Sequence, residues 1–299
     1  EMVSSGDVWA LGTGAMDGNT TVEHYDGQRW SVVEAPREAG YVVRLDDIAA
    51  VTRDQVWAVG SRTKAPNGED KSATPESEVE TKPDFHSLIA RWNGVSWSIM
   101  QVPDVGHLEH IAVFSEQDLW ALSSQVALHW DGSTWSTFQV PTASWAEVSA
   151  SAPDDIWLAG WTTRGDKVRF TPLPTTAHWD GRTWSMVPPA AIPGAPAEYA
   201  GKLDGIAAIA KNDVWAVGTR FGPPKQDPNG YSLASDDQTL VMHWGGTAWN
   251  YVPGPNLFSS QHFNDIVAVS DRELWAVGTI DPSSYGSRVL VTRFWRDPC

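Results

Sequence analysis

Four titratable side chains stand at matching positions in four segments of the chain that are otherwise rich in small and apolar residues. Each comes directly before the first apolar residue of its segment: Asp47, His110, Glu147 and Asp265. The residues one position earlier are also polar in three of these segments: Asp46, Glu109 and Asn264. A fifth segment of the same kind has Asp204 at that position. This is the densest convergence of ionisable groups in the chain, so its chemistry is considered first.

Three interpretations fit these residue types. Carboxylates and one histidine could coordinate a hard or borderline divalent metal, which Asp47, His110, Glu147 and Asp265 would then hold. Closely placed carboxylates also raise one another's pKa, which provides an acid and a base for proton transfer. Finally, Asp and Asn cap turns by accepting backbone N–H bonds, which is a structural role. The residues alone leave all three open.

Two repeated motifs show which elements must position these residues. The first runs from an Ile or Val to a Trp nine residues later, as in IAAVTRDQVWAVG from Ile48 and IAAIAKNDVWAVG from Ile206. The second holds two aromatic residues five apart, as in AHWDGRTWSMVP from Ala177. Each unit therefore predicts four short strands joined by polar turns, and no helical periodicity interrupts them.

About six such units predict an all-β fold, a single β-propeller of four-stranded blades around a central channel. The predicted domain is 1–299, with blades at about 1–36, 43–103, 107–141, 144–189, 200–254 and 262–299. The last unit ends just after its third strand, so we expect either a three-stranded blade or a strand that this sequence does not contain.

The two motifs, DVWAVG and HWDGxxW, resemble those of the actinobacterial tryptophan-repeat β-propellers, and the resemblance covers nearly the whole chain. The Gly-x-Thr-Trp of Gly132 to Trp135 is also similar to the Asp-box hairpin of sialidase-type propellers, although the aspartate directly precedes the glycine here. Neither family implies one activity.

The repeated aromatic residues are predicted to be scaffolding. Of 18 tryptophans, 15 occupy repeat positions, and a residue required in every blade most simply packs one sheet on the next. The histidines before the second motif, His24, His129, His178 and His243, alternate with Arg91 and Arg293. Since arginine cannot replace a zinc ligand, we expect these histidines to be structural hydrogen-bond donors.

Variation is confined to the connections of one face, where we expect a single asymmetric pocket at the channel mouth. The residues there that break the repeat are the predicted substrate-binding groups: Trp145, Trp161, Arg62, Arg220, His107, His262 and Tyr199. The two tryptophans could stack a sugar or a planar ring, and the arginines could clamp a carboxylate or phosphate. Packing contacts and salt bridges are the structural alternatives.

Composition excludes several function classes. A formal charge of −16 disfavours nucleic acid and anionic membrane as partners. There is no apolar run long enough to span a bilayer, and the first residues lack the regions of a signal peptide. Cys299 is the only cysteine. Bacterial cytoplasm and secretion both remain open as locations. No GxSxG, P-loop, HExxH or CxxC signature is present.

The leading hypothesis is an enzyme, a hydrolase, lyase or cyclase, that acts on a small organic or peptide-like substrate by acid–base chemistry. Its polar centre would be Asp47, His110, Glu147 and Asp265, with or without a divalent metal. The alternatives are a carbohydrate-binding module that uses Trp145 and Trp161, and a protein-interaction scaffold.

Overall fold

The fold was determined as a computed structural model that describes residues 1–13, 20–65, 84–165, 170–195, 199–222, 225–226, 232–233, 236–256, 260–280 and 287–295. The regular elements of these residues are all strands, which confirms the all-β prediction. None of them forms a helix with the length and apolar character to cross a membrane. The chain divides into two compact units, Glu1–Gln139 and Val140–Cys299, described in turn.

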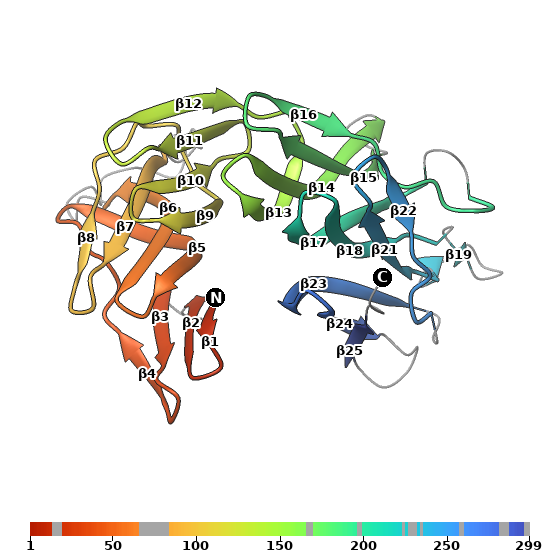
Figure 1. The fold of residues 1–299 in the computed structure, drawn as a ribbon, viewed down its shortest axis with the longest axis horizontal. Helices are drawn as coiled ribbons and strands as arrows, with labels where there is room; N and C mark the ends of the chain where they lie inside the picture. The colour runs from red at the N-terminus through yellow and green to blue at the C-terminus, as the bar shows by residue number, and fades with distance from the viewer. Residues whose placement is uncertain are drawn as a thin grey trace, which may run out of the picture. The chain divides into compact units, whose positions relative to one another are not determined.

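Unit 1 contains three four-stranded antiparallel sheets, blades 1 to 3 (Figure 1). Blade 1 is formed by β1 (Met2–Ser4), β2 (Asp7–Thr13), β3 (Thr20–Tyr25) and β4 (Trp30–Val33). Blade 2 is formed by β5 (Tyr41–Thr52), β6 (Gln55–Lys64), β7 (His86–Trp92) and β8 (Trp97–Ile99). Blade 3 is formed by β9 (His110–Ser115), β10 (Asp118–Leu122), β11 (Val126–Trp130) and β12 (Trp135–Gln139).

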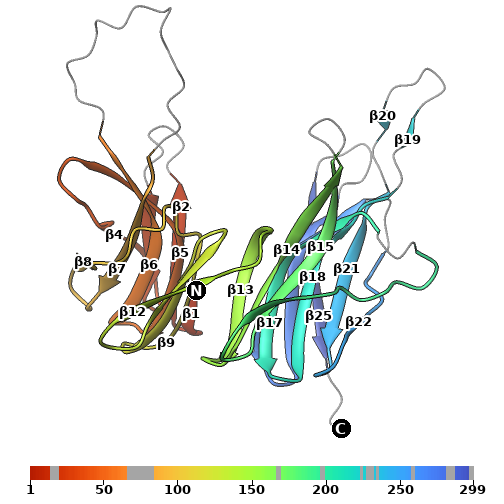
Figure 2. The ribbon, with the colours of Figure 1, turned by 90° about the horizontal axis from the view of Figure 1, so that it is seen from above.

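Unit 2 holds blades 4 to 6, whose strands stand side by side in Figure 2. Blade 4 is formed by β13 (Ser144–Ala152), β14 (Asp155–Gly165), β15 (Phe170–Trp179) and β16 (Trp184–Val187). Blade 5 is formed by β17 (Gly201–Ala210), β18 (Asp213–Arg220), β21 (Gln238–Trp244) and β22 (Trp249–Tyr251), and a two-stranded ribbon, β19 (Lys225–Gln226) and β20 (Ser232–Leu233), precedes β21. Blade 6 is formed by β23 (Gln261–Ser270), β24 (Glu273–Ile280) and β25 (Arg288–Trp295).

These six meandering sheets are the blades of a β-propeller fold, as the repeat predicts. Blade 6 has three strands among the described residues, in agreement with the early end of the last repeat. The prediction of one domain over 1–299 stays a prediction, since each unit is compact by itself.

The apolar core of each unit lies between neighbouring sheets. Trp9 of blade 1 packs with Leu45, Ile48 and Val56 of blade 2, and Trp57 of blade 2 packs with the apolar residues of blade 3. Trp157 repeats the arrangement between blades 4 and 5. Indoles of the second strands are therefore the contact between blades, and burying each one contributes roughly 4 to 6 kcal/mol of gross transfer free energy.

The repeated histidines form a constant side-chain triad with a tryptophan and a carboxylate. In blade 4, the His178 ring stacks on Trp157 with centroids 4.2 Å apart, and His178 Nε2 lies 2.7 Å from Asp155 Oδ1. The same contacts join Trp9, His24 and Asp7 in blade 1. These contacts are the kind expected of structural histidines, as the sequence predicts.

The second repeated motif contains an Asp-Gly pair, and the geometry of the turn between its two strands explains why. In blade 3, Asp131 Oδ1 accepts hydrogen bonds from the backbone N–H groups of Ser133 and Thr134 at 2.8 and 2.7 Å. Gly132 has a φ of +90°, a conformation that side chains with a Cβ rarely adopt. The Asp-Gly pair thus stabilises the turn.

Candidate functional site

A β-bulge at the start of the first strand controls where the candidate carboxylates point. In blade 2, Leu45 pairs with Gly60 and Asp47 pairs with Val59, so Asp46 is an extra residue. Leu45 and Ile48 consequently both enter the core facing blade 1. Asp46 and Asp47, which lie between them, both turn their side chains toward blade 3. Bulges of this kind re-aim side chains near functional sites.

The glycine of the VWAVG motif makes this bulge sterically feasible. A Cβ atom on Gly60 would stand 2.0 Å from the Arg44 carbonyl oxygen, and one on Gly160 would stand 2.0 Å from that of Ser144. Blades 5 and 6 show the same clash at their glycines. Blade 3 has Ser123 in place of the glycine, and there the pairing of β9 with β10 ends at His110 and Leu122.

Asp47 is bound to the backbone of two blades. Its Oδ1 atom accepts from Ile48 N at 2.7 Å and its Oδ2 atom accepts from Ile111 N at 2.9 Å, in the next blade. Burial outweighs these two bonds and raises the pKa of Asp47 to about 6. This geometry favours the capping interpretation for Asp47, while the raised pKa is of the kind that acid–base chemistry uses.

Asp46 and His107 form a hydrogen-bonded pair across the boundary between blades 2 and 3. The His107 Nε2 atom lies 2.7 Å from Asp46 Oδ2, and Arg44 Nε donates to Asp46 Oδ1 at 3.0 Å. Phe85 stacks on the His107 ring at a centroid distance of 5.6 Å. The hydrogen bond to Asp46 raises the pKa of His107, because the carboxylate stabilises the imidazolium.

Glu109 completes this cluster. It is half-buried beside the pair, and burial raises its pKa despite the nearby imidazole. An imidazole held by a carboxylate and a carboxyl group with a raised pKa are the two components of acid–base catalysis. Asp46, His107 and Glu109 are hereafter called the unit 1 cluster.

Unit 2 carries an equivalent arrangement at the boundary between blades 5 and 6. Asp204 is the bulge residue between Leu203 and Gly205, as Asp46 is in blade 2, and Lys202 Nζ lies 2.7 Å from its Oδ1 atom. His262 matches His107 in position, but its Nε2 atom lies 2.5 Å from Thr279 Oγ1. In unit 1 the histidine binds the Oδ2 atom of Asp46, whereas the Oδ2 atom of Asp204 is buried and has no hydrogen-bond partner among the described residues.

The remaining predicted catalytic residues lie at the same strand starts. Glu147 Oε1 accepts from Val148 N at 3.1 Å, and Asp265 Oδ1 accepts from Ile266 N at 2.6 Å. His110 is half-buried at the first position of β9. Asp47 and His110 belong to unit 1, whereas Glu147 and Asp265 belong to unit 2.

The metal interpretation gains no support from this arrangement. Across the described ranges, no group of three or more His, Cys, Asp or Glu side chains is placed to hold a metal ion. The carboxylate oxygens of Asp47, Glu147 and Asp265 are directed at backbone N–H groups instead.

The two predicted stacking tryptophans differ in exposure. Trp145 is only 7% exposed, and its Nε1 atom donates to Pro141 O at 3.1 Å. Trp161 is half-buried, and Lys202 Nζ lies 5.9 Å from its ring centroid. A sugar that stacked on both tryptophans would need one exposed ring face on each of them. Because Trp145 is buried, this geometry does not favour the carbohydrate hypothesis.

Of the other predicted binding residues, Tyr199 and Arg220 lie in unit 2 and Arg62 lies in unit 1. Tyr199 is buried in the core of unit 2, where its hydroxyl donates to Ala190 O at 3.2 Å and burial raises its pKa to about 12. Arg220 is bonded to the Gln238 side chain. Arg62, the equivalent arginine of unit 1, is bonded to Glu38 and lies over the Tyr41 ring at 5.3 Å.

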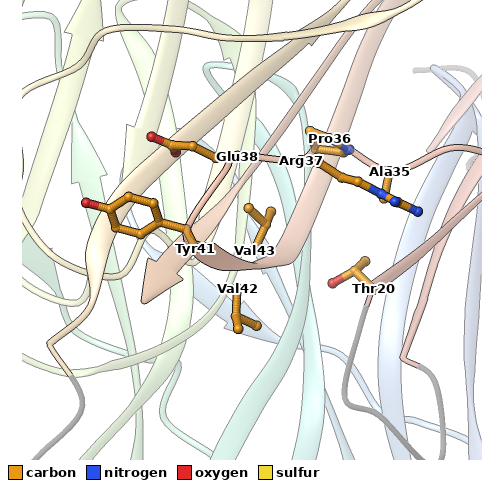
Figure 3. Close-up of a pocket in the computed structure, with 8 residues that line it drawn as sticks. All are labelled: Thr20, Ala35, Pro36, Arg37, Glu38, Tyr41, Val42 and Val43. Carbon is orange, nitrogen blue, oxygen red and sulfur yellow. The ribbon is translucent and has the colours of Figure 1, made fainter. Parts of the chain in front are cut away.

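A cavity of about 510 Å³ opens in unit 1 beside that arginine (Figure 3). Its lining residues come from the start of β3, the connection between blades 1 and 2, and the start of β5: Thr20, Ala35, Pro36, Arg37, Glu38, Tyr41, Val42 and Val43. A smaller cavity of about 290 Å³ is also lined by residues 34–37, together with Val95, Ser96, Trp92 and Trp97. Neither cavity was predicted from the sequence, although function was expected on the face that carries this connection.

Comparisons with known proteins identify no family. No family model matches the chain, and no curated protein matches it. Among solved structures, it is similar to an extracellular domain from B. thetaiotaomicron, with 10% identity, a TM-score of 0.43, and coverage of 95% of this chain and 38% of that chain. The present chain thus spans 38% of the length of that relative.

Two further solved structures are similar over most of both chains. A protein of unknown function from Dyadobacter fermentans has 12% identity and a TM-score of 0.44, with coverage of 95% of this chain and 86% of that chain. The C-terminal WD40 domain of Sif2 has 8% identity and a TM-score of 0.39, with coverage of 91% and 89%. Similarities this distant assign no activity.

Proposed function

We propose that the protein is an enzyme that acts on a small organic or peptide-like substrate by acid–base chemistry at the unit 1 cluster. The observation that carries this proposal is the hydrogen bond between His107 Nε2 and Asp46 Oδ2, with half-buried Glu109 beside it. The proposal covers hydrolase, lyase and cyclase reactions, since each of them can use one acid and one base.

The roles follow from the positions of the protons. His107 donates its Nε2–H to Asp46, so its other ring nitrogen, Nδ1, is the atom that accepts a proton from the substrate. Asp46 stabilises the imidazolium formed in that step. Glu109, whose raised pKa keeps more of it protonated, returns a proton to the leaving group.

The proposed acid–base groups are Asp46 and Glu109, one position before Asp47 and His110, together with His107, which the sequence predicts as a substrate-binding residue. Asp47 and His110 adjoin the cluster in the chain and stay candidates for shaping it, but Asp47 already binds two backbone N–H groups. Glu147 and Asp265 would act, under the same proposal, only within unit 2.

A panel of chromogenic esters, peptide anilides and lactones tests the proposal. We expect at least one class to be turned over, and His107→Gln and Asp46→Asn to reduce kcat by about 100-fold or more. The matched control is His129→Gln, since His129 forms a similar 2.9 Å pair with Asp118 but belongs to the structural triad of blade 3. Equal activity in His107→Gln and His129→Gln would contradict the proposal.

We also propose that the chain belongs with the actinobacterial tryptophan-repeat propellers. The support is the triad of Trp, His and Asp, which accounts for the Asp and Trp of the DVW motif and for the His of the HW motif. An alignment of repeats from such proteins that lacked the pairing of this aspartate with this histidine would contradict the proposal.

A further inference from the structure

The larger cavity of unit 1 has opposite charges at its two ends. Figure 3 shows the Glu38 carboxylate and the Tyr41 ring on one side and the Arg37 guanidinium on the other. Val42 and Val43 lie between them, and Ala35 and Pro36 complete the apolar part of the lining. At about 510 Å³, the cavity lies within the size range of small-molecule sites.

The negative end is fixed by its neighbours. Glu38 Oε2 lies 2.5 Å from Arg62 Nη1, and both side chains are about three-quarters buried. The Arg62 guanidinium lies 5.3 Å from the Tyr41 ring centroid, which holds that ring beside the carboxylate. Since this end is preorganised, a bound cationic group needs little reordering of the protein.

The positive end is an exposed arm. The side chain of Arg37 is 83% exposed, and its Nε atom lies 3.5 Å from Glu34 Oε1, which is a long ion pair. Thr20 lies on the same side of the cavity in Figure 3, and its hydroxyl is anchored by the N–H of Leu45 at 2.9 Å. An anionic ligand group would therefore be recognised by a planar guanidinium, which binds carboxylates with two parallel hydrogen bonds.

Net charge defines the ligand more narrowly. The lining of the cavity contains one charged side chain of each sign, Arg37 and Glu38, so the charges of the lining residues balance. A ligand with a single charge would upset this balance, whereas a neutral ligand with separated charges complements both ends. The valines and Pro36 favour an apolar group between those charges.

We propose that this cavity binds a zwitterionic, peptide-like ligand: a short peptide or α-amino acid with free termini and an apolar side chain. Its ammonium group binds Glu38, its carboxylate binds Arg37, and its side chain contacts Val42 and Val43. The cavity shares no lining residue with the unit 1 cluster, so this binding site is separate from the proposed acid–base chemistry.

Calorimetry with the dipeptide Ala-Leu tests the proposal on the full chain. We expect saturable binding, and blocking either the amino terminus by acetylation or the carboxyl terminus by amidation is expected to weaken it by about 10-fold or more. Equal affinity for free and blocked dipeptides, or no saturable binding of the free dipeptide, would overturn the proposal.

Two variants locate the site. Val42→Trp fills the cavity at a position that is 42% exposed, so the fold tolerates it and binding is lost. Val32→Trp, at a 70% exposed position outside the lining, is the matched control and retains binding. Loss of binding in both variants, or in neither, would overturn the assignment.

A third variant separates this site from the proposed enzyme activity. His107→Gln is expected to retain the affinity for Ala-Leu while it loses turnover. If His107→Gln lost dipeptide binding as well, the claim of two separate sites would be overturned.

Discussion

Asp204 stands at the same bulge position as Asp46, yet only Asp46 is bound by the histidine of the next blade. His107 lies 2.7 Å from Asp46, whereas His262 is bonded to Thr279 and leaves Asp204 Oδ2 without a partner among the described residues. Replacing Thr279 with Val removes that competing bond. We expect His262 to turn to Asp204, and a crystal structure of the variant measures this as a hydrogen bond between His262 Nε2 and Asp204 Oδ2. An unchanged orientation of the His262 ring in Thr279→Val would show that another contact holds it.

The pair of His107 and Asp46 in unit 1 makes the free energy of unfolding depend on pH, and the direction of that dependence can be predicted. The folded-state pKa of His107 is above its value in the unfolded chain, about 6.5, because Asp46 binds the imidazolium. The stabilisation is thus complete below about pH 6.5 and is lost as pH rises through the raised pKa. Asp46→Asn should abolish this change, which is under about 1 kcal/mol because the pair is partly exposed to solvent. Urea unfolding of both proteins between pH 5 and 9, roughly the interval around that titration, measures it.

Asp47 is expected to matter for stability through its two backbone bonds. Asp47→Ala leaves the N–H groups of Ile48 and Ile111 without acceptors and should lower the free energy of unfolding by about 2 to 3 kcal/mol. Because burial raises its pKa to about 6, the wild-type protein should also lose stability as pH rises from about 4 through about 6, and the variant should not. Urea unfolding tests both effects. A variant with full stability and no turnover would instead make Asp47 a catalytic residue.

The sequence predicts the blades well because their spacing is set by local rules. The nine-residue separation between Ile48 and Trp57 fixes two antiparallel strands and their turn, and Ala49 pairs with Trp57 as that spacing requires. The histidine of each HW motif is constrained by its own blade, so its role is also predictable. Contacts within one hairpin are visible in sequence because the partners are close along the chain.

The site is less predictable because it forms between blades. Sequence position groups His110 with Asp47, but the bulge turns Asp46 toward blade 3, where His107 meets it. A signal for the bulge was present, since Leu45 and Ile48 are both apolar with two acidic residues between them, and Gly60 lies on the paired strand. His262 is hydrogen-bonded to the hydroxyl of Thr279, and the repeated motifs do not predict that partner.

The glycine opposite the bulge provides a direct steric test. Gly60→Ala places a Cβ about 2.0 Å from the Arg44 carbonyl oxygen, which the sheet cannot relieve without losing the bulge. We expect a loss of more than about 3 kcal/mol in the free energy of unfolding, together with loss of the raised His107 pKa. Gly12→Ala is the matched control, since Gly12 holds the same position in blade 1 and a Cβ there meets nothing within 4 Å. Equal stability of the two variants would refute the steric role of Gly60.

Asp155 is the most deeply buried carboxylate of the constant triads, with a side chain only 1% exposed. Burial opposes its charge, but hydrogen bonds with His178, Ser151 and Trp157 outweigh that cost and hold the pKa of Asp155 below its usual range. Its stabilisation is therefore present above the unfolded-state pKa of about 3.9 and is lost as pH falls through the lower folded-state value. Asp155→Ala should cost about 3 kcal/mol or more at neutral pH, because it leaves the buried Trp157 Nε1–H and the His178 ring without their acceptor. Thermal unfolding at neutral pH and under acid conditions measures this, and Asp154→Ala, which removes a 55% exposed carboxylate paired with Lys211 on the surface, is the control. If Asp155→Ala and Asp154→Ala were equally stable, the triad would be a consequence of blade packing and not one of its causes.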